Sequence, residues 1–143
     1  MKKLFGYLFI GLTIFTVGCA EAHQEEIALA NTQQEFAKGE RKDVSVEEFD
    51  TFIASTNGTV LDVRTPEEWA NGTIKGAIKI NFYDDNFKSK IADLNRTNPV
   101  YVYCKLGGRS GKAATQMAEM GFTVYNLLGG ITAWKNAGKS MDK

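Results

Sequence analysis

The chain has 143 residues, of which 43% are hydrophobic, and its 17 basic side chains balance 17 acidic ones. This length and composition are typical of a single soluble globular domain. The balanced charge argues against binding to nucleic acid. The one histidine, His23, excludes a metal site built from several histidines and argues against a catalytic Cys–His pair, so neither a metal nor a cofactor is expected.

The first residues have the pattern of a secretory signal. Lys2 and Lys3 precede an apolar run over residues 4–17, which is followed by Gly18. A positive start, a short apolar core and a small residue at the end are typical of such signals. The run is shorter than the ~20 residues that a membrane span needs, which argues against the alternative of a retained membrane anchor. We therefore predict a signal peptide over residues 1–18.

The end of this signal is open to two interpretations. TVGC, from Thr16 to Cys19, resembles the lipoprotein box of bacteria, in which the cysteine becomes the lipid-bearing first residue; Thr16 replaces the usual Leu, Val or Ile. Alternatively, Ala20 and Ala22 form an A-x-A pattern for ordinary cleavage. We favour lipid attachment at Cys19, which predicts a protein exported to the bacterial periplasm or cell envelope and anchored to the membrane. Polar residues 19–42 would form a flexible tether, and residues 43–143 the domain.

Within this domain, helical patterns alternate with short apolar runs. Capping patterns mark two helix starts, at Ser45 with Glu48 and at Thr65–Pro66 with Glu68. Further helical segments are predicted around Phe87, after the segment CKLGGRS, and around Trp134. Short strands are predicted at residues 59–63, 77–80, 100–103 and 123–127.

This alternation predicts an α/β fold. A mainly parallel central sheet would be covered by helices on both faces, which gives three layers. In such sheets ligands bind beyond the carboxyl ends of the strands. Cys104 follows directly on the apolar run VYVY at residues 100–103, so it would lie at such an end.

CKLGGRS, from Cys104 to Ser110, predicts an activated cysteine in an anion-binding loop. A thiol between a buried strand and a helix start faces backbone N–H groups, which favours the thiolate. Gly107 and Gly108 allow the loop to curl, and Arg109 adds a permanent positive charge. If Cys19 is acylated or removed, Cys104 is the one thiol left and no internal disulfide can form. The alternative is a buried, unreactive cysteine.

Three motifs in order carry a resemblance to rhodanese-like domains. DVRTPEEWANGTIKGAIKI (Asp62 to Ile80) resembles the family pattern D-V-R-x-x-x-E-[FYW]-x-x-G-H-I-x-G-A-x-x-I, with Thr73 in place of the usual His. CKLGGRS resembles the active-site loop of the family, and LLGGITAW, at residues 127–134, resembles its closing segment. The resemblance covers residues 43–138 and implies the three-layer rhodanese-like fold in a single-domain sulfurtransferase.

The resemblance also implies the roles of individual residues. Cys104 would attack a small anionic sulfur donor such as thiosulfate, become a persulfide, and pass the sulfur to a thiol or to cyanide. The substrate-binding loop would consist of Lys105, Leu106, Gly107, Gly108 and Arg109. Asp62, Arg64 and Ser110 would support the site. We expect Asp62 and Arg64 to anchor the turn after their strand rather than to take part in the chemistry, because structural ion pairs are the commoner role.

Two other functions compete with this interpretation. A related phosphatase or arsenate reductase fold has a longer loop, whereas here four residues separate Cys104 from Arg109 and leave too little room for a tetrahedral oxyanion. A sulfur carrier or protein-binding module without fast turnover is the second alternative, because a fold does not fix a function. We expect a monomer, since nothing in the sequence demands an oligomer.

Overall fold

The structure is a computed structural model that describes residues 39–143. The predicted signal at residues 1–18, the predicted lipid site Cys19 and the tether up to residue 38 lie outside the described residues. Within residues 39–143, no helix has the length and apolar character needed to cross a membrane.

The described part of the chain contains one sheet of five parallel strands. They are β1 (Arg41–Val44), β2 (Thr59–Asp62), β3 (Ile78–Lys79), β4 (Val100–Tyr103) and β5 (Val124–Leu127). Their order across the sheet is β1-β5-β4-β2-β3, and every neighbouring pair is parallel. The predicted parallel α/β sheet is therefore confirmed.

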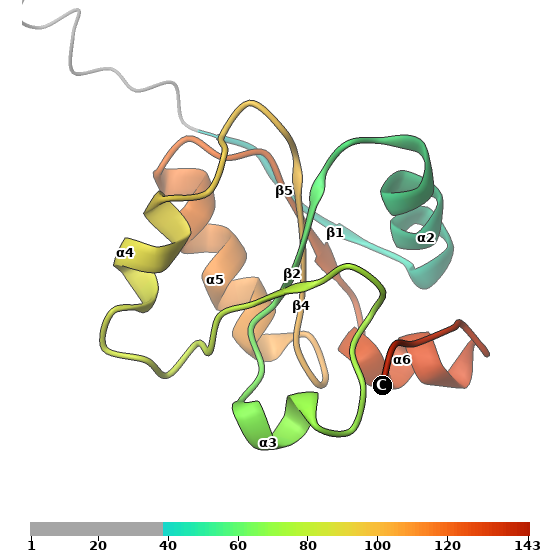
Figure 1. Cartoon of the computed structure of the whole chain (residues 1–143). Coiled ribbons are helices and arrows are strands. Elements are labelled where there is room, and N and C mark those ends of the chain that lie inside the picture. Colours follow the sequence, from blue (N-terminus) through green and yellow to red (C-terminus); the bar gives the residue numbers. More distant parts are fainter. Residues whose placement is uncertain (1–38) are drawn as a thin grey trace, which may run out of the picture. The chain divides into compact units, whose positions relative to one another are not determined.

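Helices cover both faces of this sheet, as Figure 1 shows. They are α2 (Val46–Ser55), α3 (Pro66–Trp69), α4 (Phe87–Ala92), α5 (Gly108–Glu119) and α6 (Gly130–Asn136). The helices α4 and α5 pack on one face around β2 and β4, and α2 and α6 pack on the other. The predicted three-layer arrangement is confirmed.

The strand β4 is buried on both of its faces, which explains the continuous apolar run in the sequence at residues 100–103. All four of its residues are buried. Val100 and Val102 belong to the core under α4 and α5, while Tyr101 and Tyr103 belong to the core under α2 and α6. Apolar side chains on both faces give a continuous hydrophobic run, as expected for a central parallel strand. This strand fixes the position of Cys104, which follows it directly.

One strand was not predicted. The predicted tether included Arg41 and Lys42, but both belong to β1 and pair with Val124 and Tyr125 of β5. The tether prediction therefore extended too far. Three of the four residues of β1 are exposed and polar, and Val44 alone is buried. An edge strand that is held by backbone pairing leaves no hydrophobic pattern in the sequence.

The C-terminal residues pack against the segment that carries the family motif at residues 62–80. Thr73, at the position where the family usually has His, is buried, and its backbone exchanges two hydrogen bonds with Asp142 (2.8 and 2.9 Å). The indole N–H of Trp134 donates to the carbonyl of Ser140, and Lys139 pairs with Asp50 of α2 at 2.5 Å. Backbone pairing to the C-terminus thus stabilises the segment that carries Thr73.

Candidate active site

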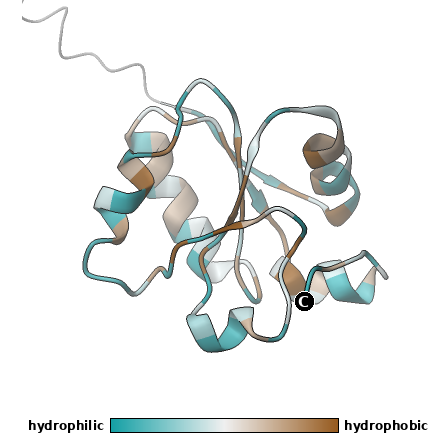
Figure 2. Ribbon diagram, viewed as in Figure 1, coloured by the Kyte–Doolittle hydropathy of each residue, from teal (hydrophilic) through white to brown (hydrophobic). Residues whose placement is uncertain are grey.

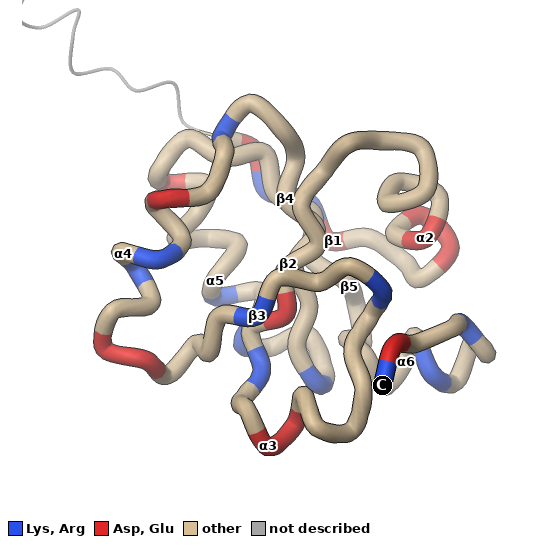
Figure 3. Tube along the Cα trace, in the orientation of Figure 1, with Lys and Arg blue, Asp and Glu red and all other residues tan. Residues whose placement is uncertain are grey.

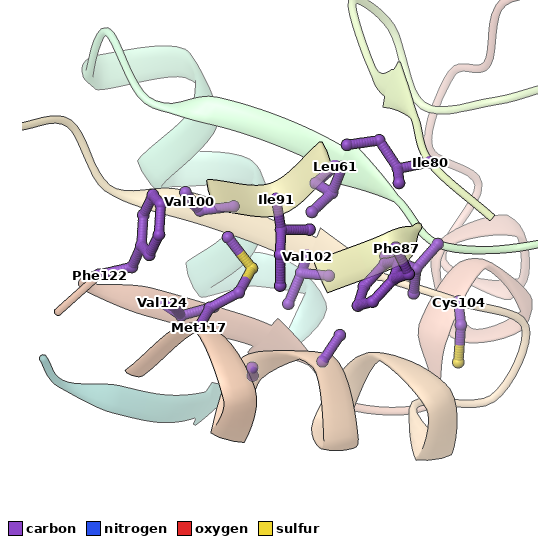
Figure 4. Close-up of a cluster of buried hydrophobic side chains, with 13 residues drawn as sticks. Leu61, Ile80, Phe87, Ile91, Val100, Val102, Cys104, Met117, Phe122 and Val124 are labelled. Atoms are coloured by element: carbon purple, nitrogen blue, oxygen red, sulfur yellow. The ribbon is translucent and has the colours of Figure 1, made fainter. Parts of the chain in front are cut away.

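The loop after β4 holds Cys104 at the first turn of α5. Gly107 precedes α5 with a φ of +96°, a left-handed conformation that favours glycine. This turn brings the N–H of Gly107 to 3.1 Å from Cys104 Sγ. The Ser110 hydroxyl, one turn further along, lies 3.4 Å from the same sulfur. Figure 4 shows Cys104 at one end of the buried cluster, with its sulfur beside the start of α5.

These hydrogen bonds favour the thiolate of Cys104. Burial by itself raises the pKa of the thiol, because it disfavours the charged form. The Ser110 hydroxyl and the backbone N–H groups of Ser110, Leu106 and Gly107 outweigh that effect, so the pKa lies below its ordinary value of 9.0. The main stabilising groups are thus hydrogen-bond donors of the loop, among them backbone N–H groups of the kind predicted from the sequence.

Arg109 is held beside the loop by a carboxylate that the sequence analysis had noted only as a helix cap. Its guanidinium donates to both oxygens of Glu68, at 2.7 and 2.8 Å. The pKa of Glu68 falls from its ordinary 4.5 to about 2, mainly because Arg109 donates to the carboxylate; burial opposes this shift, and the N–H of Thr65 contributes to it. Arg109 also lies over the ring of Tyr83, 5.7 Å from its centroid. Glu68 and Tyr83 therefore fix the orientation of the Arg109 guanidinium.

Asp62 and Arg64 form a buried ion pair that braces the turn between β2 and α3. The shortest contact joins Arg64 Nη2 to Asp62 Oδ2 at 2.6 Å, and both side chains are almost completely buried. Arg64 also donates to the backbone carbonyls of Glu68 (3.1 Å) and Gly72 (2.8 Å). The pair thus uses its hydrogen bonds on the turn itself and makes none with Cys104. These are the contacts that an anchoring role requires, and the role itself stays a prediction.

The start of α6 supports the loop from its other side. The N–H of Ile131 donates to the carbonyl of Cys104 (2.8 Å), and the hydroxyl of Thr132 donates to the carbonyl of Lys105 (2.9 Å). Gly130 has a φ of +57°, and a Cβ at this position would overlap the backbone of Cys104 and Lys105. The closing motif LLGGITAW is therefore part of the site, because its second glycine lets α6 approach the loop.

Pockets lie on either flank of the loop. One, of about 390 Å³, is lined by Leu106, Gly107 and Gly108 together with residues of β1, α5 and β5. Another, of about 250 Å³, lies between α3, the loop and α6, and includes Glu68, Lys105, Thr132 and Lys135. Among residues 39–143, no group of three His, Cys, Asp or Glu side chains could hold a metal ion. The setting suits an anionic substrate at a nucleophilic sulfur.

The fold and the loop can be compared with known proteins. The family model of the rhodanese-like domain matches residues 45–137. The chain belongs to the rhodanese-like family.

Relatives and solved structures agree with this assignment of the rhodanese-like domain. Thiosulfate sulfurtransferase GlpE of Shewanella oneidensis is 32% identical over 97 residues, which cover 67% of this chain and 94% of that protein. The chloroplastic thiosulfate sulfurtransferase 16 of Arabidopsis thaliana is 35% identical over 89 residues, which cover 54% of this chain and 74% of that protein. The crystal structure of a rhodanese-related protein from Thermoplasma volcanium matches with a TM-score of 0.65 at 28% identity, over 71% of this chain and 97% of that one. Relatives named as sulfurtransferases support sulfur transfer as the activity at the level of the family.

The rhodanese-like domain brings most of the predicted site residues together. Gly107 and Ser110 contact the sulfur of Cys104 directly. Lys105 and Leu106 are exposed at the rim, and Gly108 begins α5 with open space around it. Asp62 and Arg64 are adjacent to the site but contact each other, and Cys19 lies outside the described residues.

Glu68 and Tyr83 were missed as residues of the rhodanese-like site. Glu68 belongs to the capping pattern that begins at Thr65, and its carboxylate does accept from the N–H of Thr65 (3.1 Å). Because capping accounts for a glutamate at this position, nothing in the sequence indicated a second role. Tyr83 lies in the connection between β3 and α4, which has no regular pattern. No local sequence rule joins either residue to Arg109, which is 41 residues from Glu68 in the chain.

Proposed function

We propose that this protein is a sulfurtransferase that takes sulfane sulfur from thiosulfate and transfers it to a thiol or to cyanide through a persulfide on Cys104. One observation carries the proposal: the Sγ of Cys104 accepts hydrogen bonds from Gly107 and Ser110 inside a loop that begins a helix. These donors favour the thiolate, which is the form that attacks sulfur.

The first step forms the persulfide. The Cys104 thiolate attacks the outer sulfur of thiosulfate, a bond forms between the two sulfurs, and the sulfur–sulfur bond of the donor breaks. The electron pair of that bond leaves with sulfite, which is stable as an anion and needs no proton. Arg109, held by Glu68, supplies positive charge beside the loop for the incoming and departing anions.

The second step returns the enzyme to its starting state. The acceptor attacks the outer sulfur of the persulfide, the bond to Sγ breaks, and the electron pair stays on Cys104 as a thiolate. The N–H groups that favour the resting thiolate also suit the negative charge on the outer sulfur of the persulfide. Neither step requires a general acid, which is consistent with a site built without histidine.

Mass spectrometry of the intact protein tests this mechanism. After incubation with thiosulfate, the parent protein is expected to gain the mass of one sulfur atom, and Cys104→Ser is expected to gain none. The added mass should disappear on addition of cyanide or a thiol. If the parent gains no sulfur while its fold is intact by circular dichroism, the thiosulfate mechanism is wrong.

A partner-fed sulfur carrier is a second candidate, and one observation favours it. Leu106 and Leu128 are exposed by 66% and 52%, and both line the larger pocket beside the loop. Exposed apolar side chains that gather at one place are typical of protein contact sites. Slow turnover with every small thiol, together with fast sulfur loss to a protein thiol, would favour the carrier over the free-standing enzyme.

We also propose that the protein is exported and attached to a membrane by a lipid on Cys19. The sequence of residues 1–22 supports this, through its positive start, its apolar run and the TVGC segment. Metabolic labelling with radioactive palmitate tests it. Label should appear in the parent and be absent from Cys19→Ser, whereas equal label in both would exclude attachment at Cys19.

A further inference from the structure

The smaller pocket beside the active-site loop carries positive charge that has no role in the persulfide chemistry proposed above. Its wall includes two basic side chains, Lys105 from the loop and Lys135 from the last turn of α6. Both are exposed, and neither has an ion-pair partner among residues 39–143. Figure 3 shows basic positions on α6 and acidic positions on α3, the two helices that border this pocket.

The other charged groups of the pocket are already neutralised. Arg64 uses its guanidinium on Asp62 and on two backbone carbonyls. Both oxygens of Glu68 accept from Arg109. Because these pairs cancel, Lys105 and Lys135 leave the pocket with an excess of positive charge. A pocket with this charge suits a carboxylate or another small anion.

The position of the pocket decides which substrate this anion belongs to. Its lining includes neither Cys104 nor Gly107, whose N–H reaches the sulfur. The sulfonate end of thiosulfate is bonded directly to the sulfur under attack, so it must lie against the loop around Cys104. An anion held by Lys135 must instead be joined to the reacting sulfur through several further bonds. A thiol with a distant carboxylate meets that requirement.

We propose that Lys135, together with Lys105, forms a subsite for the carboxylate of a low-molecular-weight thiol acceptor. The inference rests on the proposed function, since it concerns the second step of sulfur transfer. In that step the acceptor thiolate attacks the outer sulfur of the Cys104 persulfide, a new sulfur–sulfur bond forms on the acceptor, and the Cys104 thiolate leaves. The subsite holds the acceptor in place and takes no part in the bond changes.

Steady-state kinetics of Lys135→Gln test the subsite. The acceptors are mercaptopropionate and mercaptohexanoate, and the neutral comparisons are mercaptoethanol and mercaptohexanol. For at least one of the two carboxylates, KM should rise about threefold to fivefold, as expected for the loss of one exposed ion pair, with kcat unchanged. KM for thiosulfate and for the neutral thiols should not change. The effect should shrink in high salt, because exposed charges are screened.

Lys112→Gln is the matched control. Lys112 is an exposed lysine of α5 that lines the larger pocket on the other flank of the loop. Removing it changes the net charge by the same amount, so an equal rise in KM for both variants would overturn the subsite in favour of a general field effect. A rise confined to thiosulfate would assign Lys135 to the donor and overturn it as well.

These results separate failure of the subsite from failure of the proposed function. If Cys104 forms the persulfide and the neutral thiols discharge it, the sulfur-transfer mechanism stands. An unchanged KM for both carboxylates in Lys135→Gln would then overturn the subsite alone. If Cys104 forms no persulfide, the proposed function fails before the acceptor is involved.

Discussion

Two arginine–carboxylate pairs border α3, and they differ mainly in their access to water. The Asp62–Arg64 side chains are exposed by 0% and 3%, whereas those of Glu68 and Arg109 are exposed by 26% and 18%. In the buried pair, Arg64 also donates hydrogen bonds to backbone carbonyls of the turn. The half-buried pair leaves Arg109 beside the active-site loop, with its guanidinium over the Tyr83 ring.

The comparison teaches that the same ion-pair chemistry serves structure or function according to burial. A buried charge that loses its partner is strongly destabilising, so Asp62 and Arg64 depend on each other for the fold. A pair that water can reach contributes little to stability, so the fold tolerates changes at Arg109. Figure 2 shows that α3, the helix that carries Glu68, is largely hydrophilic.

Arg64→Ala gives the largest expected effect. It leaves Asp62 buried without a counter-charge and frees two backbone carbonyls, so the free energy of unfolding should fall by about 3–5 kcal/mol. Urea denaturation measures this loss. Persulfide formation by the remaining folded protein should be largely kept. An unchanged unfolding curve together with lost activity would mean that Arg64 acts in the chemistry.

Arg41→Ala is the matched control for that change. Arg41 also pairs with an aspartate two residues away, Asp43, at 2.9 Å, but those side chains are exposed by 37% and 41%. Its loss should cost less than about 1 kcal/mol. A cost equal to that of Arg64→Ala would show that burial does not set the difference.

Arg109→Gln should have the opposite effect to Arg64→Ala, with a large loss of activity and a small loss of stability. Loss of a cation beside the loop should lower kcat/KM for thiosulfate about tenfold or more, the equivalent of one charge-assisted hydrogen bond. The free energy of unfolding should fall by less than about 1 kcal/mol. Initial rates of persulfide formation and a denaturation curve measure the two quantities. A large stability loss with unchanged kcat/KM would place Arg109 with the structural pair.

Glu68→Gln sharpens the comparison through pH. The Glu68 pKa lies at about 2, mainly because Arg109 donates to it, while its ordinary value is 4.5. A lowered pKa stabilises the fold above the unfolded-state value, and this stabilisation is lost as the pH falls from about 4.5 to about 2. The parent should therefore exceed Glu68→Gln in stability by up to about 1 kcal/mol at pH 7, with a smaller gap near pH 3. Denaturation curves at both pH values measure the gap, and a constant gap would contradict the assignment.

Ser110→Ala should give the smallest effect. The Ser110 hydroxyl lowers the pKa of Cys104, so its removal moves the pKa upward. The rate of alkylation by iodoacetamide at pH 7 should fall about threefold, as expected for one neutral hydrogen bond. The pH profile of alkylation should shift to higher pH. If instead Arg109→Gln shifts that profile more than Ser110→Ala does, the charge of Arg109 rather than the hydrogen-bond donors of the loop sets the pKa of Cys104.

Local sequence patterns predicted the parts of the fold that rest on local physics. The buried run at residues 100–103, the capping pattern at Ser45 and Glu48, and the glycines of the CKLGGRS loop each have one strong explanation. They were enough to place a cysteine at the end of a central strand. The exposed edge strand β1 was missed, because its stability comes from pairing with β5, which is 83 residues away in the chain at Asp43 and Asn126.

The sequence by itself determined the α/β class, the family and the position of Cys104 at the end of a central strand, because each is encoded by residues that are neighbours in the chain or lie one helical turn apart. The tertiary structure decided which carboxylate orients Arg109, that Arg64 belongs to the turn, and that Lys105 and Lys135 share a pocket. These contacts join segments from different strands and helices. The pairing is fixed by the packing of the sheet and its two helical layers, which no local pattern records.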